Sequence, residues 1–222
     1  MKLEEISKKL KTTLELEDSP VGVKLFKVGE ELPEIAGPAE PIPYCASIVR
    51  ARKGASVLQG KDKHGCLLGA ANLGLINVPE KISSGEAHSS MGLFSSPAAA
   101  SKTISEVPRI DPETTRATLV FPLEKAPVEP EVIILHVNPD QAMWVALALN
   151  YNKGGRHFPS FACVGGTCGD ITAIPYLRNV PNFSTGDFGG RKRRAPEEMI
   201  VGIPVTLIEE VVNNLEKLGC PR

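Results

Sequence analysis

Val132-Ile133-Ile134-Leu135-His136-Val137 is a nearly unbroken apolar run of strand length, and it decides the fold class. Ala117-Thr118-Leu119-Val120-Phe121 upstream and Met199-Ile200-Val201-Gly202-Ile203 downstream have the same character. Short runs of this kind, rich in β-branched residues, are typical of strands that are buried on both faces of a sheet. The three runs therefore predict that residues 117–121, 132–137 and 199–203 share one sheet.

Helical patterns surround these runs. Residues 3–15 place apolar side chains at helical spacing between charged ones, Asn138-Pro139-Asp140 begins a helix, and Pro204 begins another. This alternation predicts an α/β fold, with α+β as the alternative, in which helices flank a mixed sheet with some antiparallel pairing. We expect residues 1–222 to form a single domain, and residues 158–164 to add a further strand.

The composition limits the possible partners and the location. The chain has 222 residues, is 42% hydrophobic and 23% charged, and carries a formal net charge of −1. It lacks the basic excess of a dedicated nucleic-acid binder, so we expect no nucleic-acid partner. Because we find neither a secretory signal pattern nor a membrane-length apolar segment, we expect a cytoplasmic protein with no membrane partner. Cytosolic thiols are mostly reduced, so clustered cysteines favour metal binding or catalysis over disulfides.

The clearest local motif is Cys163-Val164-Gly165-Gly166-Thr167-Cys168-Gly169-Asp170, in which two cysteines enclose a glycine-rich turn. Cys45, Cys66 and Cys168 each stand at the start of an expected helix. Free N–H groups and the helix dipole at such a position favour a thiolate and lower its pKa. The candidate metal ligands are therefore Cys45, Cys66, Cys163 and Cys168. Cys220 is interpreted as incidental, because residues near a terminus rarely form sites.

The glycine-rich turn is a second candidate feature. Glycines remove the side chains that block backbone N–H groups, so the turn predicts a small concave site for a cofactor or an anion at a helix start. Its candidate residues are Gly165, Gly166, Thr167 and Gly169. Two plainer interpretations stay open: the glycines only allow a tight connection, and the cysteines only fill the core as small hydrophobic residues.

Two other polar features carry less weight. His88 lies in a serine-rich stretch without a recognisable pattern. Arg191-Lys192-Arg193-Arg194 could hold a phosphate or carboxylate, but short basic runs are mostly solvated surface.

Several motifs in a fixed order resemble those of a known family. They are Pro43 with Cys45-Ala46-Ser47-Ile48, then Gly65-Cys66-Leu67-Leu68-Gly69-Ala70, Pro139-Asp140-Gln141-Ala142-Met143, Cys163 to Asp170, and Val201-Gly202-Ile203-Pro204. Together they resemble the uncharacterised prokaryotic family called domain of unknown function 169, common in archaea and anaerobic bacteria. The resemblance runs from about Val21 to the last helix.

The resemblance implies an intracellular protein, and it implies a shared role for the four candidate cysteines, since members often carry matching ones. Members often have a further cysteine near the position of Asp187, which this chain lacks. The first hypothesis is therefore an iron–sulfur cluster, or alternatively zinc, in a redox or cofactor-handling role with an unknown redox partner. The alternatives are a thiol redox enzyme using Cys163 and Cys168, or a module that binds a small anionic ligand at the glycine-rich turn.

Overall fold

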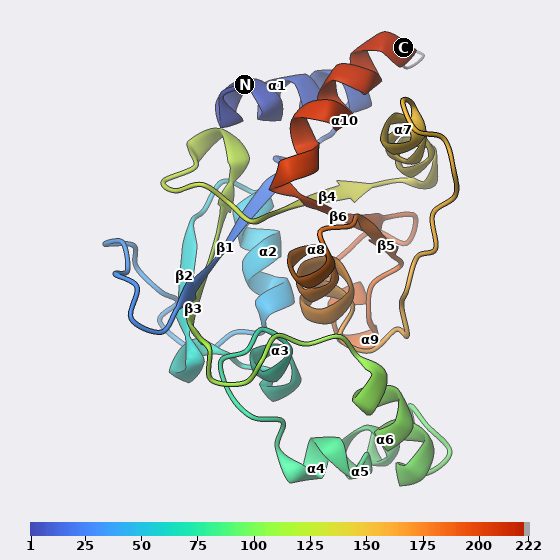
Figure 1. Cartoon of the computed structure of the whole chain (residues 1–222). Coiled ribbons are helices and arrows are strands. Elements are labelled where there is room, and N and C mark those ends of the chain that lie inside the picture. Colours follow the sequence, from blue (N-terminus) through green and yellow to red (C-terminus); the bar gives the residue numbers. More distant parts are fainter. Residues whose placement is uncertain (220–222) are drawn as a thin grey trace.

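The strands lie in one twisted sheet at the centre of the molecule (Figure 1). The structure is a computed structural model that describes residues 1–219; Cys220 lies outside the described residues. Within that range the strand order is β2-β3-β1-β4-β6-β5. The strands are β1 (Val21–Lys27), β2 (Val57–Gly60), β3 (Thr115–Pro122), β4 (Val132–Val137), β5 (Asn182–Ser184) and β6 (Met199–Pro204). Strands from both halves of the chain share this sheet, in line with the expected single domain.

The fold class is confirmed in its α+β form. Each pair of named strands in the described range is antiparallel, so the expected mixture with parallel pairs is corrected. The reason lies in the position of β1. Because β3 and β4 both run antiparallel to β1, they point in the same direction, but β1 lies between them and prevents a parallel pair. The three runs predicted to share a sheet are β3, β4 and β6.

Helices cover both faces of the sheet (Figure 1). The α-helices are α1 (Leu3–Leu14), α2 (Tyr44–Arg52), α3 (Leu67–Asn72), α4 (Glu80–Ser83), α5 (Glu86–Ser90), α6 (Pro97–Glu106), α7 (Pro139–Asn150), α8 (Ile174–Arg178), α9 (Phe188–Arg191) and α10 (Val205–Leu218). Short 3₁₀ turns η1 (Lys61–Lys63) and η2 (Leu123–Lys125) follow β2 and β3, and η3 (Gly166–Ala173) is a π-helix that leads into α8. In the described range, no helix is long and apolar enough to span a bilayer.

β4 contributes side chains to the cores on both faces of the sheet. Ile133 and Leu135 are fully buried beneath α1, α7 and α10, whereas Val132 and Ile134 face the opposite core with α2 and η3. This alternation explains why the segment is apolar at nearly every position, since a strand covered on both faces has no solvent side. The helices α4, α5 and α6 project beyond the sheet, at the bottom of Figure 1.

The π-helix η3 lies directly against the sheet because β6 offers a glycine there. A Cβ on Gly202 would collide with the carbonyl oxygen of Ile171, so only glycine permits this approach. Ile171 is fully buried in the same core. The contact fixes the position of η3, which carries Cys168.

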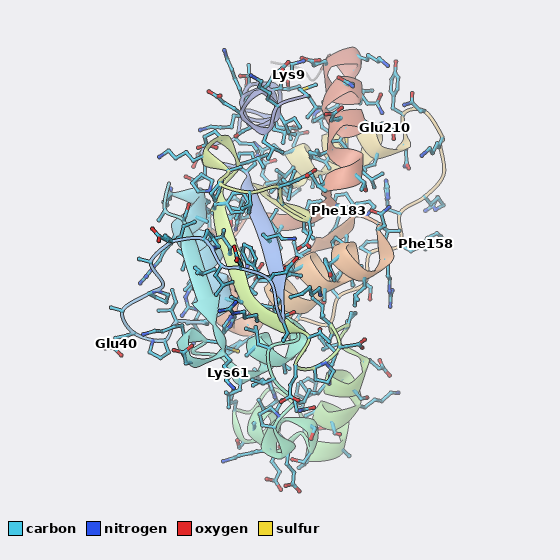
Figure 2. All side chains as sticks on the ribbon, turned by 60° about the vertical axis from the view of Figure 1, so that its left-hand side comes forward. Lys9, Glu40, Lys61, Phe158, Phe183 and Glu210 are labelled. Carbon is cyan, nitrogen blue, oxygen red and sulfur yellow. The ribbon has the colours of Figure 1, made fainter. Side chains whose placement is uncertain are left out.

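Residues 158–164 form no strand, so the prediction of one there is wrong. Phe158 is 86% exposed and stands at the periphery of the molecule, whereas Phe183 of β5 is buried (Figure 2). The backbone N–H of Ser160 donates to Asn182 Oδ1 at 2.9 Å, and Asn182 Nδ2 donates to the Ser160 carbonyl at 2.8 Å. The Asn182 side chain therefore satisfies the backbone N–H and C=O groups of Ser160, which would pair with a neighbouring strand if this segment were part of the sheet.

Candidate functional site

All four cysteines predicted as metal ligands line one cavity of about 300 Å³, which we call the cysteine pocket. Cys45 is the second residue of α2, Cys66 is the N-cap of α3, and Cys168 is the third residue of η3. Cys163 lies in the segment that leads into η3. The expected helix-start positions of three cysteines are thus confirmed, and segments distant in sequence meet at one place. The four cysteines are free thiols.

Cys66 and Cys168 are the sulfurs whose proximity is best defined. A Cβ built on Gly69 would lie 3.7 Å from Cys66 Sγ and 3.9 Å from Cys168 Sγ, so both sulfurs contact the same backbone position. The sequence instead suggests Cys163 and Cys168 as the two thiols of a redox pair. Cys168 is 7% exposed and Cys163 is exposed, so these two thiols occupy the inner and outer parts of the pocket.

Two N–H groups point at the inner sulfurs. The backbone N–H of Gly69 donates to Cys66 Sγ at 3.4 Å, and Asn72 Nδ2 donates to Cys168 Sγ at 3.4 Å. Asn72 is completely buried, and its Oδ1 has no hydrogen-bond partner among the described residues. Donors of this kind stabilise negative charge on sulfur and orient the ligand. Sequence reasoning missed Asn72, for which the only signal was a polar residue inside the apolar segment 67–73.

At Cys45 and Cys168 the pKa of the thiol is raised and not lowered, which corrects the expectation drawn from their positions at helix starts. Burial raises the pKa of the Cys168 thiol well above its usual value, and the neighbouring Cys66 adds to this rise. Burial also raises the pKa of Cys45, with a further contribution from the negative charge of Asp187. Desolvation is the largest cause at both positions, so a thiolate there is costly unless a cation offsets its charge.

The glycine-rich turn contributes only part of its expected surface. Gly165 and Thr167 line the cysteine pocket, whereas Gly166 and Gly169 are absent from its lining. A Cβ on Gly166 would lie 2.7 Å from the carbonyl carbon of Gly186, and one on Gly169 would lie 2.7 Å from Val107 Cγ1. Gly165 has φ of 71°, a left-handed value that glycine adopts easily. Two of the four candidate residues therefore serve close packing.

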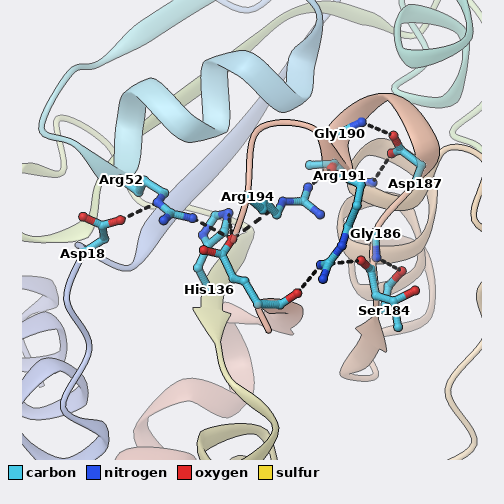
Figure 3. Close-up of polar contacts among 12 residues, drawn as sticks. Asp18, Arg52, His136, Ser184, Gly186, Asp187, Gly190, Arg191 and Arg194 are labelled. Carbon is cyan, nitrogen blue, oxygen red and sulfur yellow. Dashed lines mark hydrogen bonds and ion pairs between the residues drawn. The ribbon is translucent and has the colours of Figure 1, made fainter. Parts of the chain in front are cut away.

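A segment from β5 to β6 forms one wall of the pocket through Asp187, Phe188, Gly189 and Arg193. Asp187 is the N-cap of α9, where Gly190 N donates to Oδ1 at 2.5 Å and Thr167 N donates to Oδ2 at 3.3 Å (Figure 3). Asp187, the position at which the family resemblance implies a further cysteine, thus lies at the pocket. Here its carboxylate ties the wall to the glycine-rich turn.

Buried charges anchor that wall to the sheet (Figure 3). The Arg194 side chain is 1% exposed, and its Nη2 donates to Thr167 Oγ1 at 2.6 Å. Glu198 pairs with Arg52 Nη1 at 2.7 Å, and Arg52 Nε donates to Asp18 at 2.5 Å. The interpretation of this basic run as solvated surface holds for Lys192 and Arg193, which are exposed, and is wrong for the buried Arg194 side chain.

The four sulfurs line the cysteine pocket, but they are not gathered around one position that a single metal ion could occupy. Within residues 1–219, no group of three or more His, Cys, Asp and Glu side chains is arranged to hold a metal ion. A single zinc needs each sulfur at about 2.3 Å, which brings its ligands into mutual contact. The pocket as it stands is therefore larger than a preformed site for one ion.

Comparisons with known proteins place the sequence among archaeal relatives. Residues 9–214 match the family model DUF169, described as "Uncharacterised ArCR". The chain is 33% identical over 219 residues to "Uncharacterized protein MJ0308" of Methanocaldococcus jannaschii. This alignment covers 96% of this chain and 94% of the relative. No solved structure matches.

Proposed function

Since the chain belongs to the DUF169 family, as its ordered motifs indicated, we propose a function from its own geometry: a cytosolic protein that holds an iron–sulfur cluster in the cysteine pocket. One observation carries the proposal. Four of the five cysteines, drawn from segments up to 123 positions apart in sequence, line the same cavity. The protein would act in electron transfer or cofactor handling, together with a redox partner or a small-molecule ligand.

The dimensions and chemistry of the pocket favour a cluster over zinc. A cavity of about 300 Å³ ringed by thiols has room for a group of several atoms, whereas the described residues present no converged three-ligand set for one ion. Thiolates are the ligands that iron–sulfur clusters prefer. The N–H donors on Cys66 and Cys168 suit an anionic cluster, because hydrogen bonds to the sulfurs help to set its potential.

A bound cluster would also resolve the electrostatics of the site. Burial raises the pKa of Cys45 and Cys168, which makes isolated thiolates costly at these positions. Iron ions supply the positive charge that offsets this cost and keeps coordinating thiols deprotonated. When bound, the cluster supplies one-electron chemistry, while Leu68 and Val164 help to exclude water from it.

Purification without oxygen tests the proposal directly. We expect a brown protein that contains iron and acid-labile sulfide and whose visible absorbance bleaches on reduction. Cys168→Ser and Cys66→Ser should each lose iron relative to the unmodified chain. Cys220→Ser is the matched control, because it removes the one remaining cysteine, and it should retain the cluster. Anaerobic protein that holds neither iron nor sulfide, even after reconstitution with ferrous iron and sulfide, would refute the proposal.

The second candidate is a thiol redox enzyme, and the proximity of Cys66 to Cys168 favours it. In this case the two inner thiols, and not Cys163 with Cys168, are the better pair for a reversible disulfide. Mass spectrometry after mild oxidation distinguishes the candidates. A Cys66–Cys168 disulfide that forms and is reduced reversibly, in a protein that takes up no iron, would support the enzyme. Zinc alone in the purified protein would instead favour a structural metal site.

A further inference from the structure

The four thiols of the cysteine pocket are held unequally. Cys45, Cys66 and Cys168 sit on helix starts that pack against the core, and Cys168 is 7% exposed. Cys163 is exposed and lies in a connecting segment, with a backbone φ of 57°. A non-glycine residue in the left-handed region is uncommon. Three thiols therefore belong to the rigid frame, and the fourth stands at the rim.

The hydrogen bonds on the sulfurs differ from one thiol to the next, and Cys45 Sγ has none among the described residues. Cys66 and Cys168 each receive an N–H donor at 3.4 Å. In the described part of the chain, the only hydrogen-bond partner near Cys163 Sγ is the Thr185 hydroxyl, at 3.9 Å. N–H donors orient and stabilise a ligating sulfur, and a hydroxyl at this distance contributes little. Exposure and the lack of a helix therefore set Cys163 apart, whereas Cys45, whose sulfur also lacks an N–H donor, is half-buried on α2.

The rim beside Cys163 has the features of a ligand site. Met91 is 63% exposed and Phe188 is 53% exposed, although both line the pocket. His88 lines it too, and its buried Nδ1 has no partner among the described residues. Arg193 also lines the rim, and Lys192 Nζ lies 4.8 Å from the centre of the Phe188 ring. The pocket lining also contains the Asp187 carboxylate, but its oxygens accept the N–H groups of Gly190 and Thr167. Apolar surface next to two cations suits a small organic anion.

We infer that Cys163 is a replaceable fourth ligand, and that its departure opens the site to a small organic acid with an apolar body. This inference rests on the proposed function, since it needs a cluster held by Cys45, Cys66 and Cys168. The apolar part of the acid packs on Met91 and Phe188, and its charge is balanced near Arg193.

The exchange is a ligand substitution with no change of oxidation state. In the loaded protein Cys163 would leave as a thiol, with a proton taken from the solvent, and the carboxylate of the acid would take the ligand position that Cys163 leaves. Because no electron is transferred, neither an oxidant nor a reductant is required for this step.

The test compares Cys163→Ala with Cys168→Ala in protein purified without oxygen. We expect Cys163→Ala to keep most of its iron and sulfide, and Cys168→Ala to retain iron roughly tenfold less well or worse, as for the loss of a group that a metal site depends on. Cys66→Ala serves as a second inner variant in case Cys168→Ala does not fold, and circular dichroism checks the fold of each. Hexanoate is the ligand probe, and hexylamine is its control of opposite charge.

Electron paramagnetic resonance of the reduced protein reports on the ligand. Hexanoate should shift the spectrum of Cys163→Ala at lower concentration than that of the unmodified chain, and hexylamine should shift neither. Loss of iron from Cys163→Ala as complete as that from Cys168→Ala would overturn the inference and leave the proposed function standing. A retained cluster that hexanoate does not perturb would overturn the assignment of the ligand. Absence of iron from the unmodified chain would overturn the proposed function itself.

Discussion

Asn72 Nδ2 donates a hydrogen bond to Cys168 Sγ at 3.4 Å across 96 positions of sequence, from the last residue of α3 to the third residue of η3. A Cβ on Gly165 would lie only 2.7 Å from this nitrogen, so the left-handed glycine leaves room for the amide. The bond joins the two parts of the cysteine pocket that come from different halves of the chain. It makes Asn72 the residue whose role is most open to test.

Asn72→Leu should weaken cluster retention while preserving side-chain size. The substitution removes the N–H donor from Cys168, and loss of such a supporting group typically lowers metal affinity by about 10–100-fold. The measurement is iron released to a chelator by anaerobic protein. Asn214→Leu is the matched control, because Asn214 is equally buried but donates to the Ala148 carbonyl on the other face of the sheet. Equal iron release from both variants would contradict a role for Asn72.

Gly166→Ala should destabilise the fold by about 1–3 kcal/mol, because the new methyl group would meet the backbone of Gly186 and Asp187 within 3 Å. Backbone cannot move aside as a flexible side chain can. Urea unfolding measures the change. The control is Gly189→Ala, where the nearest atom, Asp187 Oδ1, is at 3.5 Å and the free energy should change by less than about 1 kcal/mol. Equal stability of the two variants would show that Gly166 is not a packing point.

Arg52→Ala should cost about 3 kcal/mol of unfolding free energy, the lower part of the range for breaking a buried ion pair. Arg52 pairs with Asp18 and Glu198, and all three side chains are 11–13% exposed. Its loss removes the close partner of Glu198 and, within the described residues, leaves Asp18 paired only with the exposed Lys53. Arg50→Ala on the same helix is the control, since Arg50 is exposed and its loss should be nearly neutral. Equal losses from the two variants would show that the network does not stabilise the fold.

His136→Leu should flatten the acid side of the stability profile. Burial, with Arg52 and Arg194 nearby, holds the pKa of His136 well below 6.5, and neither ring nitrogen has a hydrogen-bond partner among the described residues. Below about pH 6.5 the unfolded chain gains a proton that the folded chain does not bind, so stability falls as the pH falls, by at most about 1.4 kcal/mol per unit. Urea unfolding at about pH 7.5 and about pH 5 measures the loss, which should be smaller for the variant. An unchanged loss would show that His136 does not titrate on unfolding.

The strands could be predicted where burial dictates composition. Ile133 and Ile134 face opposite cores, which makes β4 recognisable from its apolar run alone. The insertion of β1 between β3 and β4 could not be predicted, because strand order depends on contacts across the whole chain. Phe158 illustrates the opposite error, since its segment has strand-like composition but lies exposed outside the sheet.

The cysteines that line the pocket could be predicted from the sequence, but most of the other residues that line it could not. Cysteines at helix starts are visible as spacing, and all four line one pocket. His88 and Arg193 reach the rim only because α5 and the segment after β5 approach η3 in space, and local sequence carries no trace of that approach. The raised pKa of Cys168 was also beyond sequence reasoning, since it follows from burial and not from helix position.

The division of the pocket between two halves of the chain has a consequence for its synthesis. Cys45 and Cys66 leave the ribosome before Cys163 and Cys168 by about a hundred residues. At about 5–20 residues per second, that interval lasts roughly 5–20 s. During this interval Cys45 and Cys66 are present without Cys163 and Cys168, and their thiols can react with oxidants or bind other metals. We therefore expect insertion of a cluster to follow completion of the polypeptide, so that cells starved of iron would accumulate a finished, empty chain and not a truncated one.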